Sequence, residues 1–335
     1  MDLGSKLAGI DVVWANDIDK TACHSYNINF DGSRMHHGDI RELLPSLEGY
    51  RETGVDVVFG GPPCQGFSVA GNMEQSDPRN QLLWSFCDAV DMVKPRAFVM
   101  ENVKALGTLR RWQSIRSKLL TRLQGHGYTV LTRVLTASRF GVPQNRERFF
   151  VIGFRRDLEL SEAHFDTFLA EYTCEPVTVR SVLQPLDPAG TGNNASLCAA
   201  KITMARQPVL RKSPYAGMLF NGSGRPVDLD AQAMTMTASL GGNKTPIVDE
   251  TALRNPESRP WVVDYHQKLR DNAPLPTHIP SRLRRLTVQE ASALQSFPPH
   301  FHLSGSQCAQ FRQIGNAVPP KLAAAVLGSV AKCLQ

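Results

Sequence analysis

The chain is short of several features that mark whole classes of protein. Its seven cysteines in 335 residues are odd in number and widely scattered, which argues against a disulfide framework and favours a reducing cytoplasm. No run approaches the roughly 18 apolar residues that a membrane span needs. Residues 1–6 lack the charged-then-apolar pattern of a signal peptide, and there are no internal repeats. We therefore expect a cytoplasmic protein without a membrane segment.

The chain is also low in charge for its apolar content. It is 42% hydrophobic and 20% charged, which excludes a disordered tail or a fibre and suffices for a core. Its length fits one large or two ordinary domains. Residues 1–200 hold 21 Lys and Arg against 23 Asp and Glu, whereas residues 201–335 hold 16 against 8. The basic second part indicates either a polyanionic partner or simply a basic surface, and charge alone does not decide between them.

Short apolar runs alternate with helix-like stretches through the first 155 residues. This alternation is typical of a parallel sheet covered by helices on both faces, a doubly wound α/β fold. Such folds bind ligands at the carboxyl ends of their strands. The apolar runs lie at 12–14, 55–59, 97–100, 128–135 and 149–154.

The pattern changes after this region. Residues 156–280 are rich in Pro and Gly, with weak helical periodicity, and predict a smaller, loop-rich and partly β domain. Helices are expected again over Thr287–Gln295 and Pro320–Leu334, the second with proline at its start, where the missing N–H costs nothing.

The first motif with chemical character is Gly60-Gly61-Pro62-Pro63-Cys64. It places a thiol in a stiff loop directly after an apolar strand. The two prolines fix the backbone before Cys64, as a nucleophile requires. The alternative is an incidental cysteine in a tight turn, because a free cysteine is often only a packing residue.

Two further motifs follow. Glu101-Asn102-Val103 ends the next apolar strand, where partial removal from water should raise the pKa of the Glu101 carboxyl and make it a proton donor near neutral pH. Gln144-Asn145-Arg146-Glu147-Arg148, if extended, places Gln144, Arg146 and Arg148 on one face. Taken singly, Glu101 is favoured as a capping or surface residue, and the usual form of such a basic motif is a solvated charge run.

In this order, the three motifs resemble the signature of the DNA (cytosine-5) methyltransferases, especially the bacterial restriction-modification type. The resemblance implies an α/β fold: a doubly wound, Rossmann-like methyltransferase sheet with a smaller, loop-rich target-recognition domain. The implied boundaries are a catalytic and cofactor-binding domain over 1–155, target recognition over 156–283, and a return to the catalytic domain over 284–335. Further segments match in family order, namely Asn16-Asp17-Ile18-Asp19, Gly38-Asp39-Ile40, Arg284 to Glu290 with Leu294 to Pro298, and Gly315 to Pro320.

The resemblance implies that a methyl group passes from S-adenosyl-L-methionine to carbon 5 of a cytosine flipped out of duplex DNA. Cys64 would attack carbon 6 of the ring as a thiolate. Glu101 would protonate ring nitrogen 3, and Arg148 would donate to the ring O2 oxygen, with Arg146 supporting the site. No metal is implied.

The cofactor positions carry over in the same way. Asp17 would accept hydrogen bonds from the ribose hydroxyls, and Ile18 would pack on the adenine ring. Asp39 would accept from the adenine amino group, with Ile40 beside it. Each has an ordinary alternative as a turn, cap or core residue. The remaining positions implied for the cofactor are Gly61, Pro63, Leu82, Asn316 and Val318.

Duplex DNA is the implied partner, with a restriction endonuclease as a functional partner and a monomer as the expected state. Thr, Asn and Lys suit contacts to bases and phosphates in the major groove. A polar surface loop is the alternative for residues 234–246. The implied DNA-binding residues are Gln65 and Ser68 in the loop after the cysteine, and Thr235, Thr237, Asn243 and Lys244 in that later segment.

Two other functions stay open at this point. One is the same chemistry on transfer RNA, although residues 65–71 resemble the bacterial DNA type. The other is a catalytically inactive DNA-binding remnant, because the family's first motif, a strand and a Phe-x-Gly-x-Gly loop, is not found and residues 1–4 align with the helix after it. Either the start at Met1 is mis-set or the chain is a degenerate copy of the family. In both cases, a chain that starts at Met1 is expected to fold poorly, bind the cofactor weakly and methylate nothing. An upstream-extended version should be active.

Overall fold

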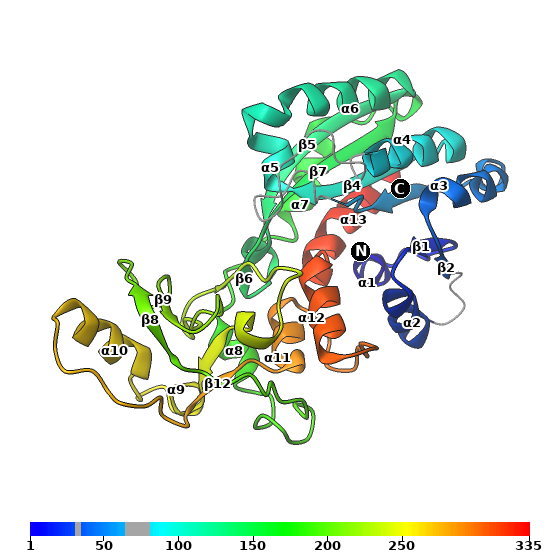
Figure 1. The fold of residues 1–335 in the computed structure, drawn as a ribbon. Helices are drawn as coiled ribbons and strands as arrows, with labels where there is room; N and C mark the ends of the chain where they lie inside the picture. The colour runs from blue at the N-terminus through cyan, green and yellow to red at the C-terminus, as the bar shows by residue number, and fades with distance from the viewer. Residues whose placement is uncertain (31–34, 64–80) are drawn as a thin grey trace. The chain divides into compact units, whose positions relative to one another are not determined.

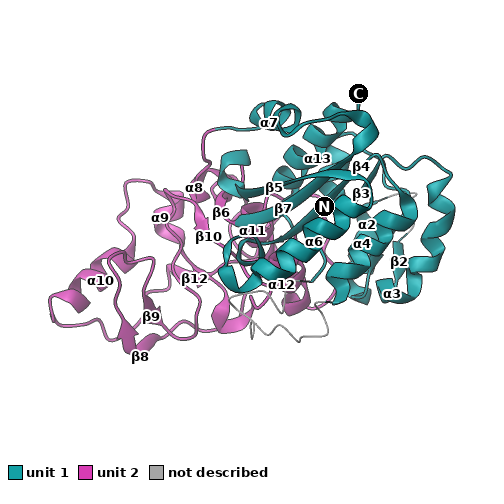
Figure 2. Cartoon of the chain, turned by 90° about the horizontal axis from the view of Figure 1, so that it is seen from above, with its two compact units in different colours: residues 1–140, 147–174, 318–335 teal, residues 141–146, 175–317 magenta. Residues whose placement is uncertain are grey.

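The computed structural model describes residues 1–30, 35–63 and 81–335 (Figure 1). Its contacts divide the chain into two compact units, shown in Figure 2. The first unit consists of residues 1–140, 147–174 and 318–335, and the second of residues 141–146 and 175–317. The segment 284–335, expected to return to the catalytic domain as a whole, is divided between the two units at residue 318.

The first unit is built on a four-stranded sheet with the order β3-β4-β7-β5. Four of the expected apolar runs contribute its strands. β3 and β4 are parallel, whereas β7 lies antiparallel between β4 and β5. The expectation of a parallel sheet is therefore wrong at β7, because the connection from β5 is too short for the crossover that parallel neighbours need. The strands are β3 (Val57–Gly60), β4 (Ala97–Val103), β5 (Tyr128–Thr136) and β7 (Glu147–Arg155).

A second, two-stranded sheet in this unit pairs β1 (Ala15–Asp17) with β2 (Met35–His37) in parallel. The expected apolar run at 12–14 precedes β1 rather than forming it. Asp17 lies opposite His37, so the residues that follow the two strands leave the sheet at the same edge.

Helices cover the four-stranded sheet on both faces. Figure 2 shows the sheet between α4 and α6 on one side and α7 and α13 on the other. Phe98 and Met100 alternate along β4 and pack in the core beside α4 and α6. α1 packs so closely on α13 that a Cβ atom at Gly4 would lie 2.4 Å from the Cβ of Ala323. The helices are α1 (Asp2–Leu7), α2 (Lys20–Asn29), α3 (Ile40–Leu43), α4 (Gln81–Val93), α5 (Lys104–Thr108), α6 (Gln113–Gly125), α7 (Glu162–Ala170) and α13 (Pro320–Leu334).

Gly153 of β7 lies opposite Phe98 of β4, where no larger side chain fits. An added Cβ would lie 2.0 Å from the Phe98 ring, which is fully buried and packs edge-on against Phe86 and Tyr128. Gly153→Ala should therefore lower the free energy of unfolding by about 1–3 kcal/mol, the usual cost of overpacking. Chemical denaturation measures this change. Gly125→Ala, whose added Cβ meets nothing within 4 Å, is the control, and an equal loss from both variants would contradict the steric explanation.

The second unit consists of short elements joined by loops. Its strands pair two by two: β6 with β10, β8 with β9, and β11 with β12. The helix expected over Thr287–Gln295 is confirmed as α11, with Thr287 as its N-cap in a capping box. The elements are β6 (Gln144–Asn145), β8 (Met204–Val209), β9 (Met218–Phe220), β10 (Ala233–Met234), β11 (Ile247–Asp249), β12 (Leu283–Arg285), α8 (Val179–Leu183), α9 (Glu250–Arg254), α10 (Trp261–Arg270), α11 (Val288–Leu294) and α12 (Gln307–Asn316).

One stretch of the described chain, Gln307–Leu334, is long and apolar enough to cross a membrane by length and composition alone. It comprises α12 and α13, which residues 317–319 separate. In its most apolar window, 61% of the residues are buried inside the protein. The sequence expectation of no run near this length overlooks the stretch because polar residues interrupt it. Burial against the protein core accounts for its apolar character.

Candidate active site

Glu101 and Arg148 form an ion pair at the end of β4. Arg148 Nε lies 2.7 Å from Glu101 Oε1, and the two side chains are 13% and 11% exposed, respectively. Glu101 lies opposite Phe150, and Val103 lies opposite Arg148, so the paired charges are diagonal neighbours on one face of the sheet. The guanidinium favours the ionised carboxylate and therefore opposes the effect of burial. The expectation drawn from the sequence considered burial alone.

The backbone that leads to Cys64 approaches this carboxylate. A Cβ atom at Gly61 would lie 3.2 Å from Glu101 Oε2. Asn102, which is 1% exposed, donates from Nδ2 to the Pro62 carbonyl over 3.2 Å. Asn102 therefore holds the loop against the end of β4. The spacing of the sequence motifs did not predict this contact.

The structure describes this loop as far as Pro63, which is exposed. The candidate nucleophile Cys64 and the candidate DNA contacts Gln65 and Ser68 lie outside the described residues. Leu82, expected beside the cofactor, lies half-buried in the first turn of α4.

The expected cofactor residues after β1 and β2 gather at one edge of the small sheet. Ile18 follows β1 and is 67% exposed, so its apolar side chain is free to pack on a ligand ring. The Asp17 carboxylate accepts from the Asp19 backbone N–H over 2.8 Å. Burial raises the pKa of the Asp17 carboxyl above its usual value, although this hydrogen bond opposes the rise.

Asp39 lies two residues after β2 and caps α3, as Asp19 caps α2 after β1. It accepts from the Arg41 backbone N–H over 2.9 Å. The Arg41 guanidinium also donates to it, and these bonds hold the pKa of the Asp39 carboxyl below its usual range. Because the Arg41 side chain is 55% exposed, the pair is a surface ion pair of small net stability. A ligand amino group can therefore compete for Asp39. Ile40 begins α3 half-buried.

The motif from Gln144 to Arg148 turns instead of running straight. Gln144 N–H donates to the Val142 carbonyl and Arg146 N–H to the Gln144 carbonyl, and bonds between residues two apart bend the backbone tightly. The expectation that Gln144, Arg146 and Arg148 share one extended face is therefore wrong. Gln144 and Arg146 belong to the second unit, whereas Arg148 belongs to the first.

Arg146 is 1% exposed and holds two backbone segments of the second unit. Its Nη1 donates to the Met236 carbonyl over 2.7 Å and its Nη2 to the Gly315 carbonyl over 2.8 Å. Gln144 joins the same network, since it donates to Gln295 Oε1 over 2.6 Å and accepts from the Met236 N–H. These contacts make Arg146 a positioning residue within its unit.

Arg146→Met tests this positioning role because it keeps the length of the side chain and removes the donors. Each buried carbonyl that loses its partner should cost about 1–3 kcal/mol, so we expect a large fall in the free energy of unfolding. Calorimetric melting measures the loss. Arg148→Met, which leaves those two carbonyls satisfied, should not reproduce the same shift, and a stable Arg146→Met protein would contradict the role.

The candidate recognition residues of the second unit are all exposed: Thr235, Thr237, Asn243 and Lys244. The Thr235 hydroxyl donates to the Asn145 carbonyl over 3.0 Å, and the Thr237 hydroxyl pairs with that of Ser239. Within the described chain, no partner is found for the side chains of Asn243 and Lys244, which stand on a short helical turn over Gly242–Lys244. These two side chains are free to contact a ligand.

The turn that carries Asn243 and Lys244 is held from behind by Arg285, to which the sequence patterns assign no role. Arg285 is 2% exposed and donates from Nη1 to the Thr245 carbonyl over 2.7 Å. Burial lowers the pKa of its guanidinium. Of the two remaining cofactor positions, Asn316 is exposed at the end of α12 and Val318 is buried.

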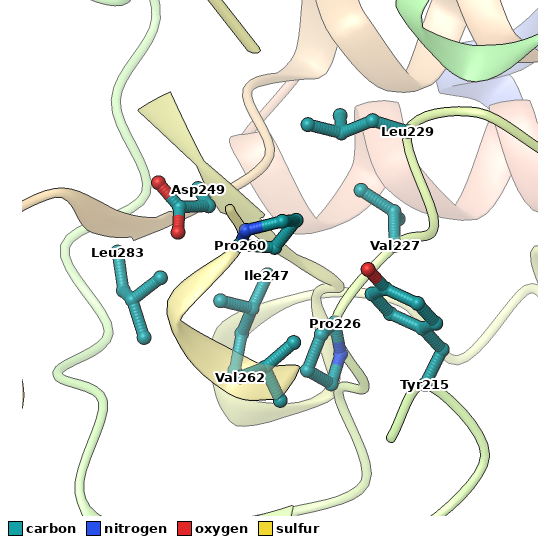
Figure 3. A pocket seen from close by; sticks show the side chains of 9 residues that line it. All are labelled: Tyr215, Pro226, Val227, Leu229, Ile247, Asp249, Pro260, Val262 and Leu283. Carbon is teal, nitrogen blue, oxygen red and sulfur yellow. The ribbon is translucent and has the colours of Figure 1, made fainter. Parts of the chain in front are cut away.

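A small cavity in the second unit is unsuited to an organic ligand (Figure 3). Its volume of about 10 Å³ gives room for about one water molecule. Burial raises the pKa of Tyr215, one of its polar lining residues, to about 12. Across the described residues, no three His, Cys, Asp or Glu side chains gather in a way that could hold a metal ion. The cavity is lined by Tyr215, Pro226, Val227, Leu229, Ile247, Asp249, Pro260, Val262 and Leu283.

Comparisons with known proteins agree with one another. The sequence profile for C-5 cytosine-specific DNA methylase matches residues 1–332. The type II methyltransferase M.XorII of Xanthomonas oryzae pv. oryzae is 31% identical over 365 aligned residues, which cover 100% of this chain and 82% of that protein. M1.HphI of Haemophilus parahaemolyticus, also a type II methyltransferase, is 31% identical, with 98% and 83% covered. The Dnmt2 methyltransferase of S. pombe superimposes with a TM-score of 0.68 over 99% of this chain and 95% of that one, at 20% identity, which is a likeness of fold.

Proposed function

The chain belongs to the family of C-5 cytosine-specific DNA methylases, and on that premise we propose that it transfers a methyl group from S-adenosyl-L-methionine to carbon 5 of a flipped cytosine in duplex DNA. The observation that carries this proposal is the buried Glu101–Arg148 pair beside the Gly61–Pro62 backbone, which leads through Pro63 to Cys64. The acid, the guanidinium and the backbone that leads to the Cys64 thiol thus lie together at one strand end. Cytosine activation needs these three groups.

The mechanism that we propose starts from the ion pair. When cytosine enters, Arg148 turns from Glu101 to donate to the ring O2 oxygen, and Glu101, released from its cation, takes up a proton and delivers it to ring nitrogen 3. The Cys64 thiolate forms a bond to carbon 6, which moves an electron pair to carbon 5. After methylation, a water molecule accepts the proton of carbon 5, the bond between carbon 6 and sulfur breaks to restore the thiolate, and ring nitrogen 3 returns its proton to Glu101.

The residues at the edge of the small sheet fit S-adenosyl-L-methionine, which would supply an electrophilic methyl group when bound. Ile18 offers a bare apolar surface to the adenine ring. The Asp17 and Asp39 carboxylates are acceptors for the ribose hydroxyls and the adenine amino group. Asp39 would exchange its exposed Arg41 partner for that amino group. We propose Ile40, Gly61, Pro63, Leu82, Asn316 and Val318 as the remaining contacts.

We propose duplex DNA as the partner, with the exposed side chains of Thr235, Thr237, Asn243 and Lys244 reading the sequence. Gln65 and Ser68 are proposed as contacts in the loop after the cysteine. The excess of Lys and Arg over residues 201–335 supports a polyanionic partner. Because the curated relatives above are named type II methyltransferases, we also propose that the protein acts beside a restriction endonuclease, as a cytoplasmic monomer.

The experiment that tests this function measures methyl transfer from labelled S-adenosyl-L-methionine to duplex DNA and to an RNA duplex of the same sequence. The protein is expressed from its natural gene, with any in-frame codons upstream of Met1. We expect 5-methylcytosine in the digested DNA and none in the RNA. Methylation of RNA alone, or of the exocyclic amine of cytosine, would contradict the proposal.

A further inference from the structure

Three cations of the second unit line one shallow hollow on its surface. Arg211 and Lys212 follow β8, and Arg270 is the last residue of α10. Together with Leu210, they line a space of about 520 Å³, and all three charged side chains are exposed. Figure 1 shows the β8–β9 hairpin beside α10 within this unit.

These cations differ from several arginines of the same unit. Five arginines elsewhere in the second unit have a carboxylate partner at ion-pair distance: Arg180, Arg254, Arg259, Arg282 and Arg284. In the part of the chain that the structure describes, Arg211, Lys212 and Arg270 have none. Like charges that converge without an anion repel one another, so the arrangement favours an anionic ligand.

The hollow is held in place by buried contacts. His266 of α10, which is 3% exposed, donates from Nε2 to the Arg211 carbonyl over 2.8 Å. Phe220 of β9 packs against Tyr265 of α10 with ring centroids 5.9 Å apart. The hairpin and the helix therefore keep the cations together. The nearest acid along the helix, Asp271, accepts from Gln267.

The hairpin also links this hollow to the candidate recognition turn. Gly222, just after β9, lies against Asn243, because its added Cβ would be 2.3 Å from the Asn243 carbonyl. Met218 at the other end of β9 pairs with Val209, and Arg211 follows two residues later. At about 3.3 Å per residue, Arg211 lies up to roughly 20 Å from Asn243.

We propose that Arg211, Lys212 and Arg270 bind the phosphate backbone of the DNA duplex that flanks the recognition sequence. This inference rests on the proposed function, since it names a second contact to the same DNA. At about 3.4 Å of helix axis per base pair, a separation of up to roughly 20 Å places these phosphates within about six base pairs of the bases read by the recognition turn. The contact carries no sequence information, because phosphates are the same at every step.

The test compares salt dependence on two duplexes that share a recognition sequence, one with three base pairs of flank and one with ten. The triple variant Arg211→Gln, Lys212→Gln and Arg270→Gln is measured against the wild-type chain. Each phosphate that the variant no longer neutralises should reduce the slope of log K against log salt by about 0.9, so we expect a reduction of up to about 2.7 on the long duplex and little change on the short one. Arg259→Gln is the control, because Arg259 is 64% exposed but paired with Asp264; its slope should stay close to that of the wild type.

Four outcomes decide the inference. Equal slopes for the wild type and the triple variant on the long duplex would overturn it and leave the proposed function intact, provided that methylation is seen. The same reduction on both duplexes would show that the cations act through the general field and not through a flanking contact. A larger reduction on an RNA duplex than on DNA would overturn the choice of partner. A wild-type chain that binds neither duplex would overturn both this inference and the proposed function.

The triple variant is expected to stay folded, since all three side chains are exposed. His266→Phe provides a second measurement, because it keeps a ring in the core and removes the bond to the Arg211 carbonyl. We expect a smaller reduction in slope from this variant than from the triple variant, again on the long duplex only. An unchanged slope with an altered melting temperature would restrict His266 to a role in stability.

Discussion

Cys64→Ser is expected to reduce methyl transfer to background while DNA binding stays near the wild-type value. A serine hydroxyl is far less ionised than a thiol at neutral pH, so it is a poor nucleophile for carbon 6 without a dedicated base. The loop is described only as far as Pro63. Asn102 anchors the Pro62 carbonyl two residues before Cys64.

Methyl incorporation and gel-shift affinity, measured on the same duplex, check this result. Cys174→Ser is the control, because Cys174 is an exposed free thiol of the same unit, and it should retain full activity. Wild-type turnover in Cys64→Ser would exclude covalent attack by this thiol. A parallel loss of DNA affinity would indicate damage to the loop.

Glu101→Gln is expected to lower the rate of methyl transfer by roughly 10²-fold or more, the usual scale for loss of general acid catalysis. The amide still fills the space beside Gly61 and still accepts a hydrogen bond from Arg148, but it delivers no proton. The variant should therefore also lose the part of the pH–rate profile that reports this carboxyl.

Single-turnover rates across a range of pH measure both effects. Glu147→Gln is the control, since Glu147 lies on the adjacent strand in an exposed pair with Lys104. That variant should keep most of the activity. Equal rates for Glu101→Gln and the wild type at every pH would remove Glu101 from the proposed proton transfer.

The strands of the first unit were predictable because their apolar runs are local. The runs at 97–100 and 149–154 lie within β4 and β7 as expected. The direction of β7 was not predictable from those runs, since strand pairing depends on contacts far apart in the sequence. The helix over Pro320–Leu334 was predictable to the residue, because proline at its start and a continuous apolar stripe mark it locally.

The candidate site divides along the same line. Glu101 and Arg148 were identified from motifs, but their contact depends on a register between two strands. The partners of Arg146 are carbonyls 90 and 169 residues away, and backbone carbonyls leave no mark in a sequence. Arg285 was unassigned for the same reason, because it also holds a carbonyl. Residue types therefore predicted the candidate site residues, whereas their hydrogen-bond and ion-pair partners could be identified only from the fold.

The close packing of α1 on α13 has a consequence for biosynthesis. The ribosome completes residues 1–140 and 147–174 of the first unit and then the whole of residues 175–317 before it reaches α13. At about 5–20 residues per second, this interval lasts roughly 7–30 s. During that time, the surfaces that receive Leu322 and Val326, both fully buried in the finished protein, stay open to water and to chaperones. We therefore expect the nascent first unit to remain protease-sensitive until the last helix emerges, even though its sheet is already complete.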